Sequence, residues 1–322
     1  MEVHPRVAFL VAAFNAAKTL PRCLEGIRAQ NPSQIVVVDD GSTDQTPSLR
    51  DQHPDVDWVR LETNQGVGAA RNAALEQVRD VDLIAFVDSD IVLGEAWLEN
   101  LLKKCDWNTY SVACGRVRAA EAGTHWAATL DEQITARTFG PKSREIGVPW
   151  REVMYFNHVF KREVFQFLGG FDPAFRTNAE DSDFFYRCAG HDLKFFYVAS
   201  AEAIHIYPPP TFETYLRRLR RNGFYTIRFH LKHATPLMGL KICKALGLVG
   251  AMPLIFLVSL FSLSLRPILL LLLAFFLAGL HQSARLGFHP WFGGWIWLSG
   301  WVARGIGEVE GLRKWMRLTS RR

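Results

Sequence analysis

The order of short apolar runs in the first hundred residues constrains the fold of this chain more than any other feature. Residues 7–13, 35–38, 58–61 and 83–87 are mostly apolar, too short for helices and typical of buried strands. Segments of helical character separate them, one opening after Thr19, one near Thr43 or Ser48, and others over 68–78 and 97–104. Strands that alternate with helices predict a doubly wound α/β domain with parallel pairing.

The chain is long enough for one large domain or one domain with an appendage, since it has 322 residues. Its five cysteines are scattered and form no Cys-x-x-Cys pair, so we expect reduced thiols in a cytosolic compartment. The N-terminus runs almost directly into the first strand, which predicts no cleavable signal peptide. The tract Pro208-Pro209-Pro210 breaks regular structure and predicts that the catalytic domain spans residues 1–210.

The C-terminal third has the pattern of a membrane protein. Residues 211–244 are basic and carry one acid, and residues 245–284 contain two long uncharged runs that predict a transmembrane helical hairpin. Residues 285–322 hold a short Trp-rich segment, predicted at the interface or as a re-entrant piece, and a basic tail. Basic flanks on both sides predict two spans with the catalytic domain on the cytoplasmic face, and argue for a membrane rather than a nucleic acid as partner. The alternative is a buried hairpin in a soluble protein.

Acidic residues follow two of the predicted strands. Asp88 and Asp90 come directly after residues 83–87, and Asp39 and Asp40 follow residues 35–38. Ligands of open α/β sheets bind at the carboxyl ends of strands, and two carboxylates one residue apart suit a hard cation such as Mg²⁺ or Mn²⁺ that bridges a diphosphate. Asp39 or Asp40 could accept hydrogen bonds from a base or a ribose. Asp is also common in ordinary turns, so each pair alone is a weak signal.

A glycine-containing loop precedes the helix predicted over 68–78. The segment from Asn64 to Asn72 reads Asn-Gln-Gly-Val-Gly-Ala-Ala-Arg-Asn, and its glycines permit close approach of a ligand to the backbone. Arg71 lies on the first turn of the helix, where the dipole disfavours a cation, which suggests that it serves an anion or a base. The spacing of Gly66 and Gly68 does not match a dinucleotide fingerprint, so an NAD site is rejected.

The ordered set of these motifs resembles the family 2 glycosyltransferases with the GT-A fold. The resemblance covers roughly residues 5 to 210. It rests on residues 12–15, 38–44, 64–72 and 88–90, on Asn157, on residues 169–172 and 180–183, and on His205. One departure is Ala12-Ala13-Phe14-Asn15, where the family often has Pro-x-Tyr-Asn. The implied fold class is a doubly wound mixed α/β sheet of the GT-A type, which binds a nucleotide-diphosphate sugar.

The resemblance implies a role for each matching residue. Ala13, Asn15, Asp39 or Asp40, and Arg71 would contact the nucleotide, Asp88 would lie near the ribose and the metal, and Asp90 would ligate Mg²⁺ or Mn²⁺, completed by His205. Glu180-Asp181 matches the family's Glu-Asp motif, in which the Asp is the general base. Neighbouring acids can raise the pKa of a carboxyl toward that of a useful base. Without the other motifs, these acids would be an ordinary acidic helix start, and His205 an ordinary structural histidine.

Together these features predict an inverting, metal-dependent glycosyltransferase anchored in the inner or plasma membrane. Its partners would be a UDP- or GDP-sugar donor and a lipid-linked or polysaccharide acceptor, and no nucleic acid. Two alternatives stay open. One is a nucleotidyltransferase that uses the same α/β domain, and the other is a catalytically silent membrane adaptor that keeps the nucleotide-binding fold.

Overall fold

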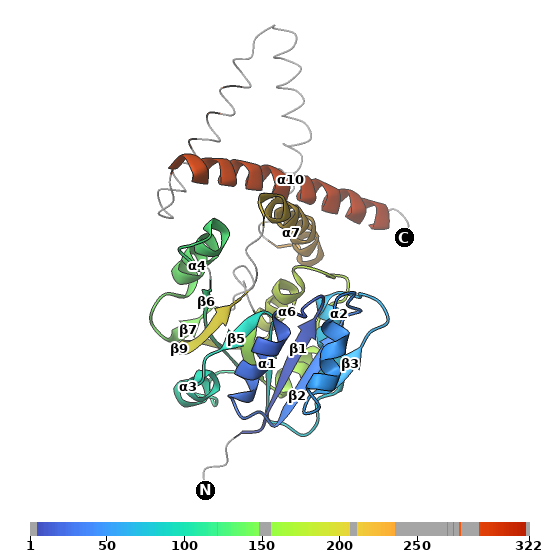
Figure 1. The fold of residues 1–322 in the computed structure, drawn as a ribbon. Coiled ribbons are helices and arrows are strands. Elements are labelled where there is room, and N and C mark those ends of the chain that lie inside the picture. The colour runs from blue at the N-terminus through green and yellow to red at the C-terminus, as the bar shows by residue number, and fades with distance from the viewer. Residues whose placement is uncertain are drawn as a thin grey trace. The chain divides into compact units, whose positions relative to one another are not determined.

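The computed structural model describes residues 5–120, 122–147, 156–206, 211–235, 269, 273, 277 and 290–319. It divides the chain into two compact units, Met1–Pro209 and Pro210–Arg322 (Figure 1). Each unit has its own packing and is described separately.

The first unit is built on one mixed sheet of nine strands. Its strands are β1 (Val7–Ala13), β2 (Gln34–Asp39), β3 (Asp57–Arg60), β4 (Leu83–Val87), β5 (Ile91–Leu93), β6 (Val112–Ala119), β7 (Arg144–Ile146), β8 (Asn157–Lys161) and β9 (Phe195–His205). The order across the sheet is β3-β2-β1-β4-β8-β6-β9-β5, and β7 pairs with β9. Pairing is parallel from β3 through β4 and between β6 and β9, whereas β8 is antiparallel to both β4 and β6.

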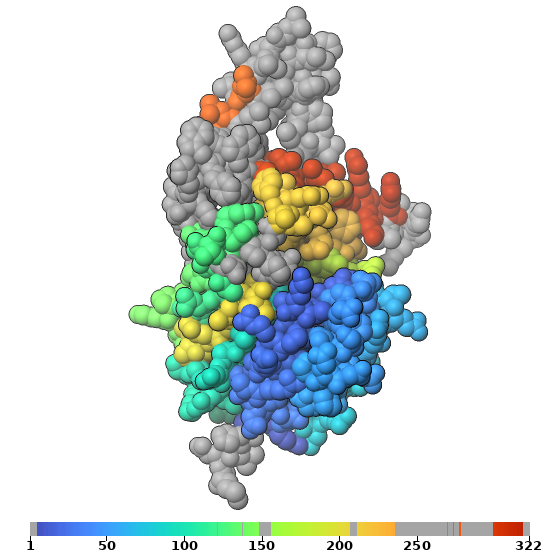
Figure 2. Space-filling model, in the orientation of Figure 1, coloured from blue at the N-terminus to red at the C-terminus, as the bar shows by residue number. Residues whose placement is uncertain are grey.

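Helices cover both faces of this sheet. They are α1 (Leu20–Arg28), the 3₁₀ helix η1 (Thr46–Gln52), α2 (Val67–Glu76), α3 (Trp97–Lys104), α4 (Trp126–Phe139), α5 (Glu163–Leu168) and α6 (Glu180–Ala189). Alternate residues of β1 enter opposite cores: Phe9 packs with residues of α1 and α3, and Leu10 packs with residues of α2 and α6. Both faces of β1 are therefore buried, which explains why its sequence is continuously apolar. The blue N-terminal segments form a closely packed surface (Figure 2).

The mixed α/β fold expected from the sequence is confirmed, with one local correction. The segment near Thr43 or Ser48 was expected to open an ordinary helix, but residues 46–52 form a 3₁₀ helix. Asp44 accepts hydrogen bonds from both the amide and the hydroxyl of Thr46, and Pro47 follows directly. Such a tight turn favours a short 3₁₀ segment over a longer α-helix.

The second unit contains two long helices, α7 (Phe212–His233) and α10 (Pro290–Thr319). They pack together through glycines. A Cβ atom at Gly307 would lie 1.7 Å from the carbonyl oxygen of Arg220, and one at Gly223 would lie 1.9 Å from that of Arg304. Arg220 also forms an ion pair with Glu310, with 2.9 Å between its Nε and Oε2.

Residues 290–319, where a short Trp-rich piece and a tail were predicted, form one helix of 30 residues, and the location of this segment at the membrane interface stays a prediction. Its glycines have little intrinsic helix propensity, but they permit the close contact with α7, and tertiary packing overrides propensity. Among the described residues, no helix is long and apolar enough to cross a membrane. The hairpin predicted over residues 245–284 falls outside the described residues, except for the exposed Leu269, Leu273 and Leu277.

Candidate active site

The two acids after β2 have different surroundings. Both carboxylate oxygens of Asp40 accept backbone N–H groups, from Gln65 at 2.7 Å and from Gly66 at 2.8 Å. Asp39 accepts the amide of Ser42 with Oδ1, whereas its Oδ2 is buried without a hydrogen-bond partner and lies 3.6 Å from Nε of Arg60. Asp40 therefore holds the following loop in place, and Asp39 keeps an acceptor oxygen that a ligand can use.

Ala13 and Asn15 shape the same loop. The carbonyl of Ala13 accepts the amide of Asp40 at 2.8 Å. Asn15 has a left-handed backbone with φ of 52°, a conformation that Asn tolerates well. Its side-chain oxygen accepts the amides of Thr43 and Asp44. Both residues predicted to contact the nucleotide thus support the backbone around Asp39.

Arg71 joins the end of β4 to the start of α6. The side chain is 6% exposed; its Nη2 donates to Oδ1 of Asp88 and its Nη1 donates to Oε1 of Glu180, both at 2.8 Å. The other oxygen of Asp88 accepts the amide of Phe156 at 2.9 Å. Both oxygens of Asp88 are therefore engaged by protein donors, and Arg71 is held between two carboxylates that are remote in sequence.

Asp90 and His205 form a separate pair. His205 Nε2 lies 3.2 Å from Oδ2 of Asp90, and both side chains are partly buried. The antiparallel pairing of β5 with β9 brings them together, because Ile91 is aligned with His205. In the part of the chain that the structure describes, no group of three or more His, Cys, Asp or Glu side chains could hold a metal ion by itself.

Asp181 lies beside Glu180 at the start of α6, after a left-handed Ala179 with φ of 69°. Burial raises the pKa of Glu180 to about 7, and the neighbouring Asp181 adds to the increase. Burial also raises the pKa of Asp181, and Arg71 opposes this increase. One cation thus faces three acids, Asp88, Glu180 and Asp181, which is the kind of environment in which a carboxyl can accept a proton near neutral pH.

Some residues of this site were not identified from the sequence. The ring of Phe156 lies under the Arg71 guanidinium, 4.1 Å from its Cζ to the ring centroid, and Phe171 lies at 5.4 Å. Arg176 donates to the carbonyl oxygens of Asn64 and Gln65. Phe171 belongs to a motif that the sequence singled out, whereas the surroundings of Phe156 and Arg176 carried no signal because their partners are distant in sequence.

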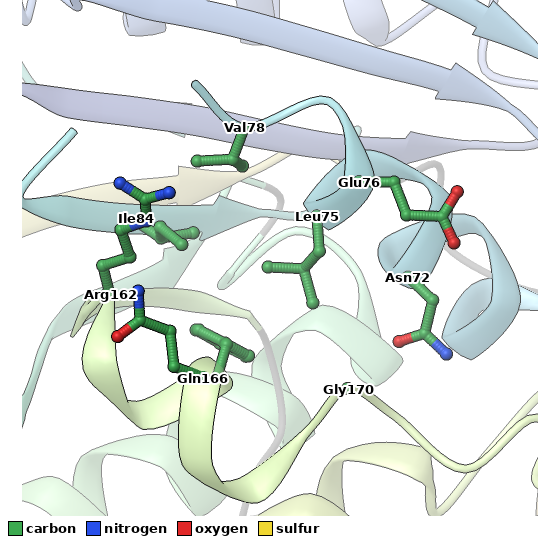
Figure 3. A pocket seen from close by; sticks show the side chains of 9 residues that line it. Asn72, Leu75, Glu76, Val78, Ile84, Arg162, Gln166 and Gly170 are labelled. Carbon is green, nitrogen blue, oxygen red and sulfur yellow. The ribbon is translucent and has the colours of Figure 1, made fainter. Parts of the chain in front are cut away.

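A hollow of about 430 Å³ lies on the α2 and α5 side of the sheet (Figure 3). Its labelled side chains include Asn72, Leu75 and Glu76 from α2 and Gln166 from α5. None of the acids described above lines it. Asn72 instead forms two hydrogen bonds with the backbone of Phe171, at 2.7 and 2.8 Å. This region therefore connects α2 to the segment that contains Phe171.

The sequence of this chain matches a known protein family. The model of the family described as Glycosyl transferase family 2 matches residues 8–169, about half of the chain. The succinoglycan biosynthesis protein ExoO of Rhizobium meliloti is 40% identical over 106 residues, which are 32% of this chain and 30% of ExoO. The O-antigen chain rhamnosyltransferase RfbN of Salmonella typhimurium is 24% identical over 214 residues, 62% of this chain and 66% of RfbN. The chain therefore spans less than two thirds of each of these relatives.

A solved structure shares the fold. The crystal structure of S. aureus TarS 1-349 in complex with UDP superimposes with a TM-score of 0.53 at 16% identity, and the alignment covers 96% of this chain and 91% of that one.

Proposed function

The chain belongs to glycosyl transferase family 2, and on this premise we propose that it transfers a sugar, with inversion, from a nucleotide-diphosphate sugar to an acceptor hydroxyl or phosphate. The observation that carries the proposal is the Arg71 bridge, since it brings a strand-end carboxylate next to a helix that begins with two acids of raised pKa. A donor site and a proton acceptor are the two parts that such a transfer needs.

Asp181 is the proposed general base. It would take the proton of the acceptor hydroxyl as that oxygen attacks the anomeric carbon and the bond from this carbon to the diphosphate breaks. Its side chain is partly exposed, so an acceptor can reach it, whereas Glu180 is 5% exposed. The raised pKa of Asp181 makes it a stronger base than an ordinary aspartate.

Asp39 supports a uridine nucleotide as the donor. Its Oδ2 is a single buried acceptor that has no hydrogen-bond partner, although it faces Arg60 at 3.6 Å. One such acceptor matches the one N–H on the pairing edge of uracil. Guanine presents two adjacent donors there and would need two free acceptors. The TarS structure that shares this fold was solved with UDP. We therefore favour a UDP-sugar over a GDP-sugar.

Asp90 and His205 fit a divalent cation of the Mg²⁺ or Mn²⁺ type. A carboxylate oxygen and an imidazole nitrogen 3.2 Å apart supply two ligands of suitable chemistry, and phosphate oxygens of a donor would supply others. Asp88 is a weaker candidate because both of its oxygens already accept protein N–H groups. When bound, the cation would neutralise the charge that develops on the diphosphate leaving group.

The acceptor is proposed to be a polysaccharide or a lipid-linked glycan of the cell envelope, because the relatives are named for succinoglycan and O-antigen synthesis.

Membrane association on the cytoplasmic side is part of this proposal. Helix α7 carries six Lys or Arg residues and one acid, and Arg217 and Arg221 are exposed. Near an anionic surface each basic residue contributes about 1 kcal/mol. Flotation of the protein with vesicles containing anionic lipid tests this, and equal flotation with neutral vesicles in high salt would argue against charge as the cause.

Turnover assays decide between the proposed function and its alternatives. The full chain is incubated with UDP- and GDP-sugars, Mn²⁺ or Mg²⁺, and membrane lipid extract. Release of UDP with a glycosylated product is expected, and Asp181→Asn should lower the rate about 10²- to 10⁴-fold while UDP binding persists. Asp51→Asn, an exposed acid in η1, is the control. A product that retains the nucleotide would indicate a nucleotidyltransferase, and binding without turnover would indicate an adaptor.

A further inference from the structure

Arg71 is fixed from several sides. Its guanidinium bonds Asp88 and Glu180 and lies over the ring of Phe156. The pKa of Arg71 is raised: burial alone would lower it, but the carboxylates of Asp88 and Glu180 outweigh burial. A buried guanidinium with two charged hydrogen bonds and an aromatic face has little freedom to move toward a ligand.

The backbone that carries Arg71 is tied to the loop that leads into α6. Gly66 has φ of 100°, and a Cβ atom there would lie 2.1 Å from the carbonyl oxygen of Arg176. The same carbonyl accepts the amide of Val67 at 3.0 Å. Asn72 closes the other end through its two hydrogen bonds with Phe171. The start of α2 and the loop before α6 therefore form one continuous support.

Helix α6 itself begins without a conventional cap. Ala179 is left-handed and offers no side-chain hydrogen bond to the first turn. A residue with a Cβ is strained in this conformation and keeps it only when surrounding contacts enforce it. The first side chain of the helix, Glu180, is buried against Arg71, and Asp181 is the next residue. The direction of Asp181 thus depends on where Glu180 is held.

We propose that Arg71 is a positioning residue, which fixes Asp181 relative to the donor side of the site by bridging Asp88 and Glu180. Glu180 is its anchor and does not exchange protons with substrate. This inference rests on the proposed function, because the role of Asp181 comes from it. It differs from a direct contact between Arg71 and the nucleotide base, because it assigns one N–H of each Nη atom to a protein carboxylate.

Steady-state kinetics and UDP titration test the bridge. In Arg71→Met we expect kcat to fall about 10²-fold, because a small misplacement of a catalytic group has effects of this size, while the Kd for UDP changes by less than about threefold. Arg71→Lys keeps the charge but cannot span both carboxylates, so it should not recover kcat. Arg79→Met, an arginine just after α2 with a 78% exposed side chain, is the control. A tenfold or larger loss of UDP affinity with unchanged kcat would overturn the proposal in favour of a base contact.

Glu180→Gln separates anchoring from proton transfer and preserves the fold, because the amide oxygen can still accept from Arg71. We expect kcat to fall about tenfold, far less than in Asp181→Asn. A loss as large as that of Asp181→Asn would assign Glu180 to the chemistry and contradict the anchoring role.

Thermal unfolding tests the bridge without turnover. At pH 8, where Glu180 is ionised, Asp88→Asn and Glu180→Gln each remove one of the two carboxylates that bond Arg71. The double variant removes both, so its loss in Tm should exceed the sum of the single losses by about 3 °C or more. The excess should vanish in an Arg71→Met background. Additive losses would refute the bridge even if the wild-type protein is an active transferase. If the losses are coupled but the wild type transfers no sugar, the bridge stands and the proposed function fails.

Discussion

Asp90 and His205, separated by more than a hundred residues, place Oδ2 and Nε2 3.2 Å apart where β5 pairs with β9. His205→Ala should raise the Mn²⁺ concentration required for half-maximal turnover at least about tenfold, because one of the two ligands on the protein is lost. Turnover is measured against Mn²⁺ concentration at saturating donor. His191→Ala, at an exposed histidine, is the control. An unchanged metal requirement in His205→Ala would show that His205 is not a metal ligand.

Asp39 and Asp40 should respond differently to the same substitution. Asp39→Asn places an amide where the base N–H would be accepted, so UDP affinity should fall roughly tenfold or more, with little change in stability. Asp40→Asn loses an acceptor for the amides of Gln65 and Gly66 and should cost about 1–3 kcal/mol of unfolding free energy. Calorimetric UDP titration and chemical denaturation of both variants measure these effects. If Asp40→Asn lost UDP affinity and Asp39→Asn lost stability, Asp40 would be the residue that contacts the base.

The contribution of Glu180 to the stability of the protein should fall as pH rises from about 4.5 to about 7. The pKa of Glu180 is raised from 4.5 to about 7 in the folded protein, mainly by burial. Between these values folded Glu180 keeps a proton that the unfolded state has released, so its contribution is full below pH 4.5 and is lost as pH rises through 7. Denaturation of Glu180→Gln at several pH values provides the comparison, because this variant should lack that contribution. Parallel pH profiles for the two proteins would contradict the prediction.

Ala179→Gly should stabilise the protein. The left-handed conformation at φ of 69° costs a residue with a Cβ about 1–2 kcal/mol, and glycine adopts it freely. The greater entropy of glycine in the unfolded chain opposes part of this gain, so we expect a net increase of about 0.5–1 kcal/mol. Ala189→Gly, in the last turn of the same helix, should instead destabilise. A loss of stability in Ala179→Gly would show that strain at the start of α6 is absent.

Gly307→Ala should separate α7 from α10. The new Cβ would lie 1.7 Å from the carbonyl oxygen of Arg220, so one backbone must move. Overpacking of this kind costs about 1–3 kcal/mol. Limited proteolysis should therefore cut within residues 211–235 sooner than in the wild type, while the first unit stays intact. Arg313→Ala, on an exposed position of α10, is the control and should leave the digestion pattern unchanged.

Much of the first unit could be predicted from its sequence. Apart from β5, which was not expected, the strands and helices up to residue 104 lie within a few residues of their expected positions, because apolar runs of strand length and caps are local signals. The 3₁₀ helix after Asp44, expected as an ordinary helix, arose from side-chain hydrogen bonds that compete with one. The single helix over residues 290–319 also escaped prediction, since its glycines are explained only by the helix they contact.

The sequence by itself determined the order of most elements up to residue 104 and predicted which residues carry the chemistry, since motif spacing along a strand or loop is a local property. Only the tertiary structure decided which partner each of those residues contacts. In that structure Asp40 accepts the amide of Gln65, whereas Oδ2 of Asp39 has no hydrogen-bond partner. Asp90 lies beside His205, and Arg71 lies between Asp88 and Glu180. Each of these relationships joins residues that are remote in the chain, and such contacts depend on sheet order and burial, which no local pattern specifies.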